Sequence, residues 1–320
     1  MKIILICLYF GKLPDYFNYY LKSCAYNKKI TWLIYTDDIS NSYILPSNVI
    51  IKHIAFDEMQ SRIQSKFDFK ISLESPYKLC DFKPAYGYIF EDEIKPFDFW
   101  GHCDLDVIWG NLNKYLTDYL FGNYEKIFTS GHMTIYKNDV YVNRRFMYEY
   151  KWHNYMFSYK KIFSTPSNFI FDENNYIFDI HKIYDQLKIP YYKALYSDIA
   201  DIDPRYSGFH VLTDDFISKH QVFKWENGSL FNIFIINNQI MQREFAYIHF
   251  LHRNMSVDTK QNINANSFLI TPCSFLSSYN VLNIDNIKLY GNNENKFNHN
   301  YTTPEESNRL YKELINKLIK

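Results

Sequence analysis

The sequence lacks the marks of several protein classes. Its 35 Lys and Arg residues are balanced by 35 Asp and Glu residues, so no excess positive charge favours binding to DNA or RNA. The five cysteines are odd in number and widely spaced, and no CxxC occurs. This pattern is typical of reduced thiols in a cytoplasm rather than of a disulfide framework or a zinc site.

Long apolar runs are also missing. No stretch approaches 18 uninterrupted apolar residues, and the N-terminal run MKIILICLYFGK is too short for a membrane span and has no small-residue cleavage site. We therefore expect a cytoplasmic protein whose first apolar run is a buried strand.

Three common catalytic signatures are absent as well. The sequence contains no GxGxxG, no GxxxxGK[ST] and no GxSxG. The usual dinucleotide-binding, P-loop and α/β-hydrolase interpretations are therefore without support.

The first half of the chain alternates apolar strands with helical patterns, which predicts an α/β fold with a Rossmann-like sheet. We expect strands at residues 3–9, 30–35, 49–54, 97–103 and 127–136, and helices at 15–25, 56–66, 75–89 and 140–150. In open α/β sheets, ligands bind beyond the carboxyl ends of the strands.

The second half changes character. Strands at 221–225 and 229–236 flank Asn227-Gly228, a strong hairpin signal, and another strand is expected at 245–250. We divide the chain into a Rossmann-like half at 1–136, a second half at 137–275 with a late strand, and a loop with a C-terminal helix at 276–320. That helix has a narrow apolar stripe flanked by lysines, so it either docks onto the domain or lies on a membrane surface.

Asp104-Leu105-Asp106 follows the expected aromatic-rich strand at 97–103. Residues i and i+2 of an extended chain point to the same side, so the two carboxylates can share a hard cation, which in turn takes diphosphate oxygens. The alternative is a solvated acidic turn. The strand context favours the metal site.

Further acids follow two other predicted elements. Asp37 and Asp38 end the second strand and suit either hydrogen bonds from a base or ribose, or a turn. Asp172 and Glu173 follow an apolar stretch and suit either a general base or a helix start.

A late strand carries a histidine with basic residues after it. His249 is a candidate metal ligand, and Arg253 is a candidate phosphate contact because its fork geometry matches phosphate oxygens. The alternative is a core histidine beside a surface salt bridge.

The sequence resembles a family of bacterial GT-A-like proteins from polysaccharide gene clusters, the DUF6625 type. The resemblance covers residues 1 to about 275 and is carried by the segments at 9–14 (YFGKLP), 36–38 (TDD), 77–87 (YKLCDFKPAYG), 99–106 (FWGHCDLD), 131–132 (GH), 172–173 (DE) and 247–249 (YIH).

The resemblance implies a sugar transferase with a GT-A fold that acts in capsule, O-antigen or similar glycan synthesis. Residues 1–136 would then be the nucleotide-sugar-binding half and residues 137–275 the acceptor-side half. It implies a UDP-hexose donor, with galactose types favoured, a Mn²⁺ or Mg²⁺ ion, and a saccharide or lipid-linked glycan acceptor. Phe10, Gly11 and Asp37 or Asp38 correspond to the nucleoside-binding positions, and Lys83 to a contact with phosphate or ribose. One departure is that His252 and Arg253 stand where a Lys-Arg pair is expected.

Two other functions remain open on the sequence. A nucleotidyl or phosphoryl transferase also uses paired acids and a metal, but only Gly11-Lys12 suits its phosphate loop. A non-catalytic glycan-binding or scaffold protein would keep the fold without the chemistry.

Overall fold

The computed structural model describes residues 1–40, 43–152, 155–173, 179–193, 198–203, 206–212, 220–251, 253–258 and 265–291. His252 and the helix predicted from residue 303 onward lie outside these ranges. Within them, no helix combines the length and apolar character needed to cross a membrane.

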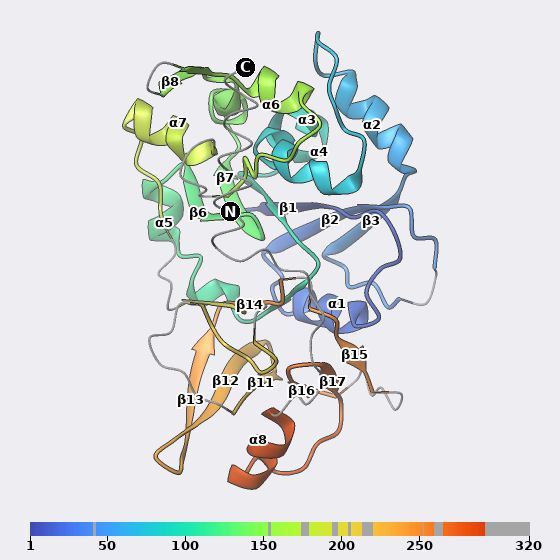
Figure 1. The fold of residues 1–320 in the computed structure, drawn as a ribbon, viewed down its shortest axis with the longest axis vertical. Helices are drawn as coiled ribbons and strands as arrows, with labels where there is room; N and C mark the ends of the chain where they lie inside the picture. Colours follow the sequence, from blue (N-terminus) through green and yellow to red (C-terminus); the bar gives the residue numbers. More distant parts are fainter. Residues whose placement is uncertain are drawn as a thin grey trace.

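A six-stranded sheet forms the centre of the molecule, with strand order β3-β2-β1-β4-β7-β6 (Figure 1). The parallel strands β1 (Ile3–Leu8), β2 (Ile30–Thr36), β3 (Val49–His53) and β4 (Phe99–Cys103) make up one side. The hairpin of β6 (Lys126–Ser130) and β7 (Met133–Lys137) adds antiparallel strands beyond β4. The parallel pair predicted from the first 38 residues is confirmed.

Strand β1 is buried on both faces, as its continuous apolar run predicts. Ile3, Leu5 and Cys7 belong to one core cluster, whereas Ile4 and Ile6 belong to a second cluster on the opposite face. Alternate side chains of a strand point to opposite faces, so this one segment joins the two cores.

Helices cover both faces of the sheet (Figure 1). The first core cluster includes residues of α1 (Phe17–Ala25). The second includes residues of α2, α3, α4, α6 and α7 and of the 3₁₀ helices η1 and η3. These elements are α2 (Phe56–Gln64), η1 (Pro76–Ala85), α3 (Tyr86–Ile89), α4 (Glu91–Ile94), η3 (Val142–Met147), α6 (Tyr159–Ser164) and α7 (Ile180–Leu187). The remaining short elements of this part are η2 (Leu112–Lys114), α5 (Asp118–Asn123) and the hairpin of β8 (Tyr150–Trp152) and β9 (Tyr155–Phe157).

Three predicted elements differ from the structure. The helix expected at 75–89 is mostly the 3₁₀ helix η1, because Pro84 has no N–H and disfavours an α-helix through this segment. The single strand expected at 127–136 is the β6–β7 hairpin, which turns at Gly131-His132. The helix expected at 140–150 is reduced to η3.

The second half builds a β-rich lobe below the central sheet in Figure 1. Its sheet has the order β13-β12-β11-β16-β17-β15, and α8 (Ile284–Gly291) packs on it through Ile287. The strands are β11 (Gln221–Glu226), β12 (Ser229–Ile236), β13 (Gln239–Phe245), β15 (Ser256–Val257), β16 (Ser267–Ile270) and β17 (Ser274–Leu276). The hairpin at Asn227-Gly228 is confirmed, and both turn residues have positive φ, 49° and 87°.

A small third sheet, β10-β14-β5, joins the two parts of the chain. It consists of β10 (Ile199–Asp201), β14 (Tyr247–His249) and β5 (Val107–Trp109). The predicted α/β class, a Rossmann-like sheet flanked by helices with a mixed second-half region, is confirmed.

Candidate active site

A cleft of about 630 Å³ opens beyond the carboxyl ends of β1 and β4. Its lining comes from five segments that are far apart in the sequence, within residues 7–16, 76–83, 104–106, 168–173 and 249–255. This is the edge where an open α/β sheet binds its ligands.

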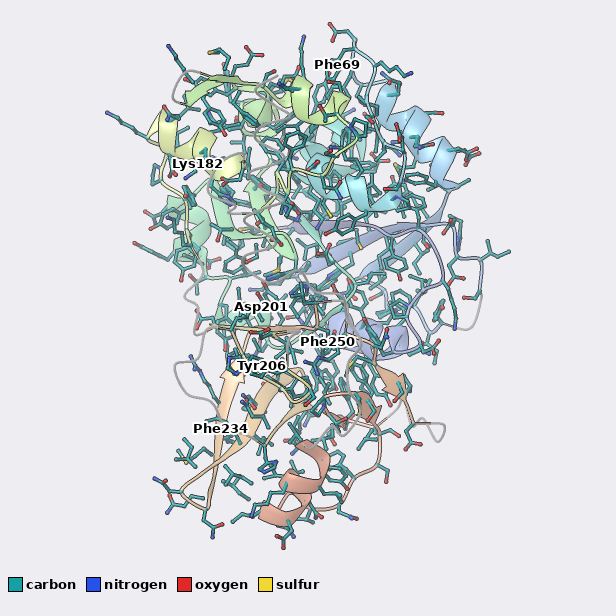
Figure 2. The ribbon with its side chains drawn as sticks, viewed as in Figure 1. Phe69, Lys182, Asp201, Tyr206, Phe234 and Phe250 are labelled. Atoms are coloured by element: carbon teal, nitrogen blue, oxygen red, sulfur yellow. The ribbon has the colours of Figure 1, made fainter. Side chains whose placement is uncertain are left out.

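The small third sheet brings the predicted metal ligands together. In its register, His249 of β14 lies opposite Val107 of β5 and opposite Asp201 of β10. The backbone N–H of Phe250 also donates to the carbonyl of Asp106 at 2.8 Å. The strand after the two acids therefore fixes His249 beside them (Figure 2 shows Asp201 and Phe250 at this junction between the two parts).

Asp104, Asp106 and His249 each offer a ligand atom, and these atoms lie within 4.8 Å of one another. All three residues line the cleft. Two carboxylates and one imidazole at this spacing suit a divalent ion such as Mn²⁺ or Mg²⁺, whose ligand bonds are about 2.0–2.2 Å long. The predicted ligand set thus fits a metal in its chemistry and its spacing.

Among the described residues, a second group of this kind consists of His132, Asp201 and His249. The His132 ring stacks on the His249 ring with centroids 4.2 Å apart. Neither His132 nor Asp201 lines the cleft. The first group is therefore the one that a ligand in the cleft can reach.

Asp201 orients the histidine. The Nδ1 atom of His249 donates to the Asp201 carboxylate at 2.8 Å, while its Nε2 atom lies 3.5 Å from Asp106. A carboxylate behind a metal-binding histidine fixes its tautomer and aims its free nitrogen. Burial alone would lower the pKa of His249, but the charges and hydrogen bonds of Asp106 and Asp201 outweigh it and raise that pKa well above 6.5.

Lys83 lies between the acids of the site. Its Nζ atom is 2.8 Å from Asp104 and 3.1 Å from Asp172, and it donates to the carbonyl of Gly131 at 2.9 Å. Burial acts to lower the pKa of this ammonium, but Asp104 and Asp172 outweigh it and raise the pKa well above its usual value. Lys83 lines the cleft, where its charge offsets that of the two acids.

Asp172 and Glu173 also line the cleft. Burial, with the nearby Glu173 charge, raises the pKa of Asp172 to about 7 despite the opposing effect of Lys83. Glu173 keeps an exposed surface, but partial desolvation by the surrounding protein raises the pKa of its carboxyl. Glu173 accepts a hydrogen bond from the N–H of Gly131 at 3.2 Å.

Position 131 has room only for glycine. A Cβ atom there would lie 2.5 Å from Oε1 of Glu173 and 2.7 Å from Oδ2 of Asp172. The backbone turn between β6 and β7 therefore approaches the two carboxylates more closely than any side chain would allow.

The loop after β1 forms another wall of the cleft. Phe10 lines it, and Gly11, with φ at +111°, turns the chain where other residues would be strained. Asp37 accepts from the N–H of Gly11 and Asp38 from the N–H of Leu13, both at 2.7 Å. The two acids hold this loop from behind and are not part of the cleft lining.

Arg253 lines the cleft but is mostly buried. Its guanidinium donates to five backbone carbonyls, those of Asp203, Tyr206, Ser207, Gly208 and Pro272. The structure therefore places this side chain as a support for Asp203 and for residues 206–208.

Several site residues escaped prediction. Asp201 lies in a strand of only three residues without a recognisable motif, so nothing in the sequence singles it out. His132 was visible only within the Gly-His pair of the family pattern, and its contact with Tyr247, at 2.8 Å, requires the fold.

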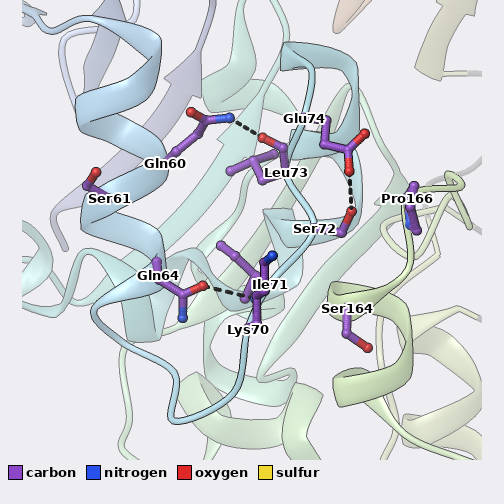
Figure 3. Close-up of a pocket in the computed structure, with 10 residues that line it drawn as sticks. All are labelled: Gln60, Ser61, Gln64, Lys70, Ile71, Ser72, Leu73, Glu74, Ser164 and Pro166. Carbon is purple, nitrogen blue, oxygen red and sulfur yellow. Dashed lines mark hydrogen bonds between the residues drawn. The ribbon is translucent and has the colours of Figure 1, made fainter.

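A second hollow of about 680 Å³ lies between α2 and residues 70–74 (Figure 3). Its amides are used internally, because Gln60 donates to the carbonyl of Leu73 and Gln64 accepts from the N–H of Ile71. It shares no lining residue with the site cleft and contains neither candidate metal group.

Three solved structures similar to this chain are glycosyltransferases. Mouse xyloside xylosyltransferase 1 in its apo form has a TM-score of 0.39 and 6% identity, covering 64% of this chain and 89% of its own. A glycosyltransferase involved in glycosylation of the major capsid of PBCV-1 has a TM-score of 0.33 and 11% identity, covering 63% and 86%. The glycosyltransferase GlyE of Streptococcus pneumoniae TIGR4 has a TM-score of 0.27 and 12% identity, covering 46% and 38%.

Identities and TM-scores this low carry no argument about function, so the function is inferred from the site of this chain. No curated protein matches the sequence. A family model does match, over residues 5–279, which is most of the chain and includes every residue of the candidate metal group. The chain belongs to the family of unknown function DUF6625.

Proposed function

We propose that this protein is a metal-dependent glycosyltransferase that takes a sugar from a nucleoside diphosphate donor, with UDP-hexose favoured. The observation that carries the proposal is the convergence of Asp104, Asp106 and His249 in one cleft, with their ligand atoms within 4.8 Å. The preferred ion is Mn²⁺ or Mg²⁺.

In this proposal the bound ion supplies Lewis-acid stabilisation of the departing diphosphate. The chain contributes the rest. Asp104 and Asp106 hold the ion, Asp201 aims His249 at it, and the Phe10–Gly11 loop shapes the wall where the nucleoside lies. Lys83 adds a positive charge beside Asp104.

We assign the general base to Glu173. An inverting transfer needs a group that takes the proton of the acceptor hydroxyl, and the metal-binding acids are occupied. Asp172 is held by Lys83 at 3.1 Å, whereas the hydrogen bond described for Glu173 is to one backbone N–H. The raised pKa of Glu173 suits a base that must accept a proton near neutral pH.

The acceptor in this proposal is a saccharide or lipid-linked glycan of a capsule, O-antigen or similar cell-surface polysaccharide, reached from the cytoplasm. The predicted C-terminal helix lies outside the described residues, so both alternatives, docking onto the domain and contact with a membrane surface, stay predictions. Vesicle co-sedimentation of the full chain and a chain truncated at residue 302 tests the membrane contact.

Thermal unfolding with UDP, Mn²⁺, both, or UDP with EDTA tests the metal site. We expect a large rise in melting temperature only with both, because the carboxylates would repel the diphosphate unless a cation offsets their charge. At 100 times the dissociation constant, binding adds about 2.7 kcal/mol of stability. Equal shifts with Mn²⁺ and with EDTA would remove the metal from the proposal.

A screen of nucleotide-sugars tests the reaction itself. Release of a nucleoside diphosphate with sugar transfer supports a glycosyltransferase, whereas release of pyrophosphate would indicate a nucleotidyltransferase. Glycan binding without any dependence on nucleotide or metal would indicate the non-catalytic alternative.

A further inference from the structure

A buried ion pair shapes one wall of the cleft. The Asp81 carboxylate is fully buried and accepts hydrogen bonds from the backbone N–H groups of Phe169 and Phe171, at 3.0–3.1 Å. The Lys78 ammonium donates to the same carboxylate at 2.6 Å. Two N–H groups that flank a single residue thus converge on one charged acceptor.

Ile170 is the residue between them, and its backbone is in the left-handed region, with φ at +56°. A β-branched side chain rarely adopts this conformation, which costs of order 1–3 kcal/mol. A glycine would fit the same turn without strain. The strain therefore accompanies a branched apolar side chain that the backbone alone does not require.

This side chain is presented to the cleft. Ile170 lines it and is 40% exposed, in contrast to its buried neighbours Phe169 and Phe171. The clamp by Asp81 turns the flanking phenylalanines into the core and Ile170 outward.

Tyr77 adds a second apolar surface to the same cleft. It lines the cleft and is 57% exposed. Burial of part of the side chain, followed by the charges of Cys80, Glu173 and Asp172, raises the pKa of its phenol to about 12. The ring thus lies within electrostatic range of the two carboxylates.

We propose that Tyr77 and Ile170 form the acceptor subsite, where they bind the apolar face of a pyranose ring while Glu173 meets its hydroxyl edge. A pyranose has C–H groups on its faces and hydroxyls at its rim, so an aromatic ring beside a carboxylate matches both. The subsite rests on the proposed function, which makes Glu173 the base.

The charges favour an acceptor over the nucleotide at this wall. Lys83 offsets the charge of Asp172, but Glu173 would repel a diphosphate, whereas a neutral saccharide carries no such penalty. The diphosphate has its own place at the Asp104, Asp106 and His249 group.

Three variants test the subsite. Tyr77→Ala should raise the acceptor KM about tenfold and lower the ratio of transfer to donor hydrolysis, because the stacking surface is lost. Tyr77→Phe keeps the ring and should bring the KM back toward the wild-type value. The rise in melting temperature given by UDP with Mn²⁺ should be the same in wild type and in both Tyr77 variants.

Ile170→Gly distinguishes a role of Ile170 in acceptor binding from a role in packing. It should raise the acceptor KM while leaving the melting temperature equal to or above that of wild type, since glycine relieves the left-handed strain. A fall in melting temperature with an unchanged KM would show that Ile170 has only a packing role and would overturn its place in the subsite.

Two results would overturn the inference for Tyr77. One is a smaller UDP–Mn²⁺ shift in Tyr77→Ala, which would place the ring against the nucleoside. The other is an unchanged acceptor KM. If the wild type shows no metal-dependent UDP binding, the proposed function fails, but the subsite can still be tested. Binding of wild type and Tyr77→Ala to an array of bacterial oligosaccharides is then compared. Weaker binding by the variant supports the subsite, and equal or absent binding overturns it.

Discussion

Replacing Asp172 by asparagine should stabilise the protein at alkaline pH. The carboxylate is 2% exposed, its Oδ1 atom is without a hydrogen-bond partner among the described residues, and burial raises its pKa from the ordinary 3.8 to about 7. Asparagine has nearly the same shape as the protonated acid. The variant therefore keeps the contacts of the neutral form and removes the cost of ionising the buried group.

The magnitude follows from linkage between protonation and folding. An acid whose pKa is raised on folding loses stability as the pH rises from its unfolded value through its folded value. The interval from 3.8 to about 7 corresponds to roughly 4 kcal/mol at about 1.4 kcal/mol per pKa unit. The cost is nearly complete at pH 8, roughly 2 kcal/mol at pH 5, and close to zero below pH 4.

Urea unfolding in EDTA measures this effect. The free energy of unfolding of Asp172→Asn should exceed that of wild type at pH 8, and the difference should shrink by about half at pH 5. Asp201→Asn is the matched control with the opposite sign. Burial acts to raise the pKa of Asp201, but the hydrogen bond and the charge of His249 outweigh it and lower that pKa. Its loss should therefore destabilise the protein at neutral pH, less so in acid.

Two outcomes would refute this reasoning. If Asp172→Asn is no more stable than wild type at pH 8, Lys83 stabilises the ionised carboxylate more than burial destabilises it. If the difference is constant between pH 5 and 8, the effect does not arise from ionisation of Asp172.

Four further predictions concern the site. Asp106→Asn should abolish the UDP–Mn²⁺ melting shift and most activity with the fold intact, and His249→Ala should do so to a lesser degree; normal turnover by Asp106→Asn would exclude it as a ligand. Glu173→Gln should cut transfer by about 10²–10⁴ with UDP–Mn²⁺ binding kept, and retention of the donor's anomeric configuration in the product would contradict its role as base. Gly131→Ala should lower both melting temperature and transfer because its Cβ would meet Glu173 and Asp172, whereas Gly122→Ala, with nothing within 4 Å, should leave transfer unchanged. Mn²⁺ binding should release a proton from His249 and weaken as the pH falls, because the pKa of His249 is raised; calorimetry in two buffers of different ionisation enthalpy detects that proton, and equal heats would show that none is released.

Local sequence patterns were enough to predict much of the fold. The apolar run of β1 and the aromatic run of β4 identify buried strands, and Asn227-Gly228 identifies its hairpin, because each depends on residues next to one another. The placement of Asp104 and Asp106 at the end of a core strand follows from the same local pattern. A turn inside an apolar segment is harder to detect, which is why the β6–β7 hairpin was predicted as one strand.

Only the tertiary structure decided which side chains meet. Asp201 reaches His249 through the register of two three-residue strands that are 48 positions apart in the chain. Asp37 and Asp38 lie where the sequence predicts, at the end of β2, yet they bind the amides of the loop after β1 instead of lining the cleft. The outward turn of Ile170 depends on Asp81, almost ninety residues earlier. Short-range periodicity fixes which faces are apolar, but these contacts depend on non-local pairing and on buried charges, which have no local sequence signal.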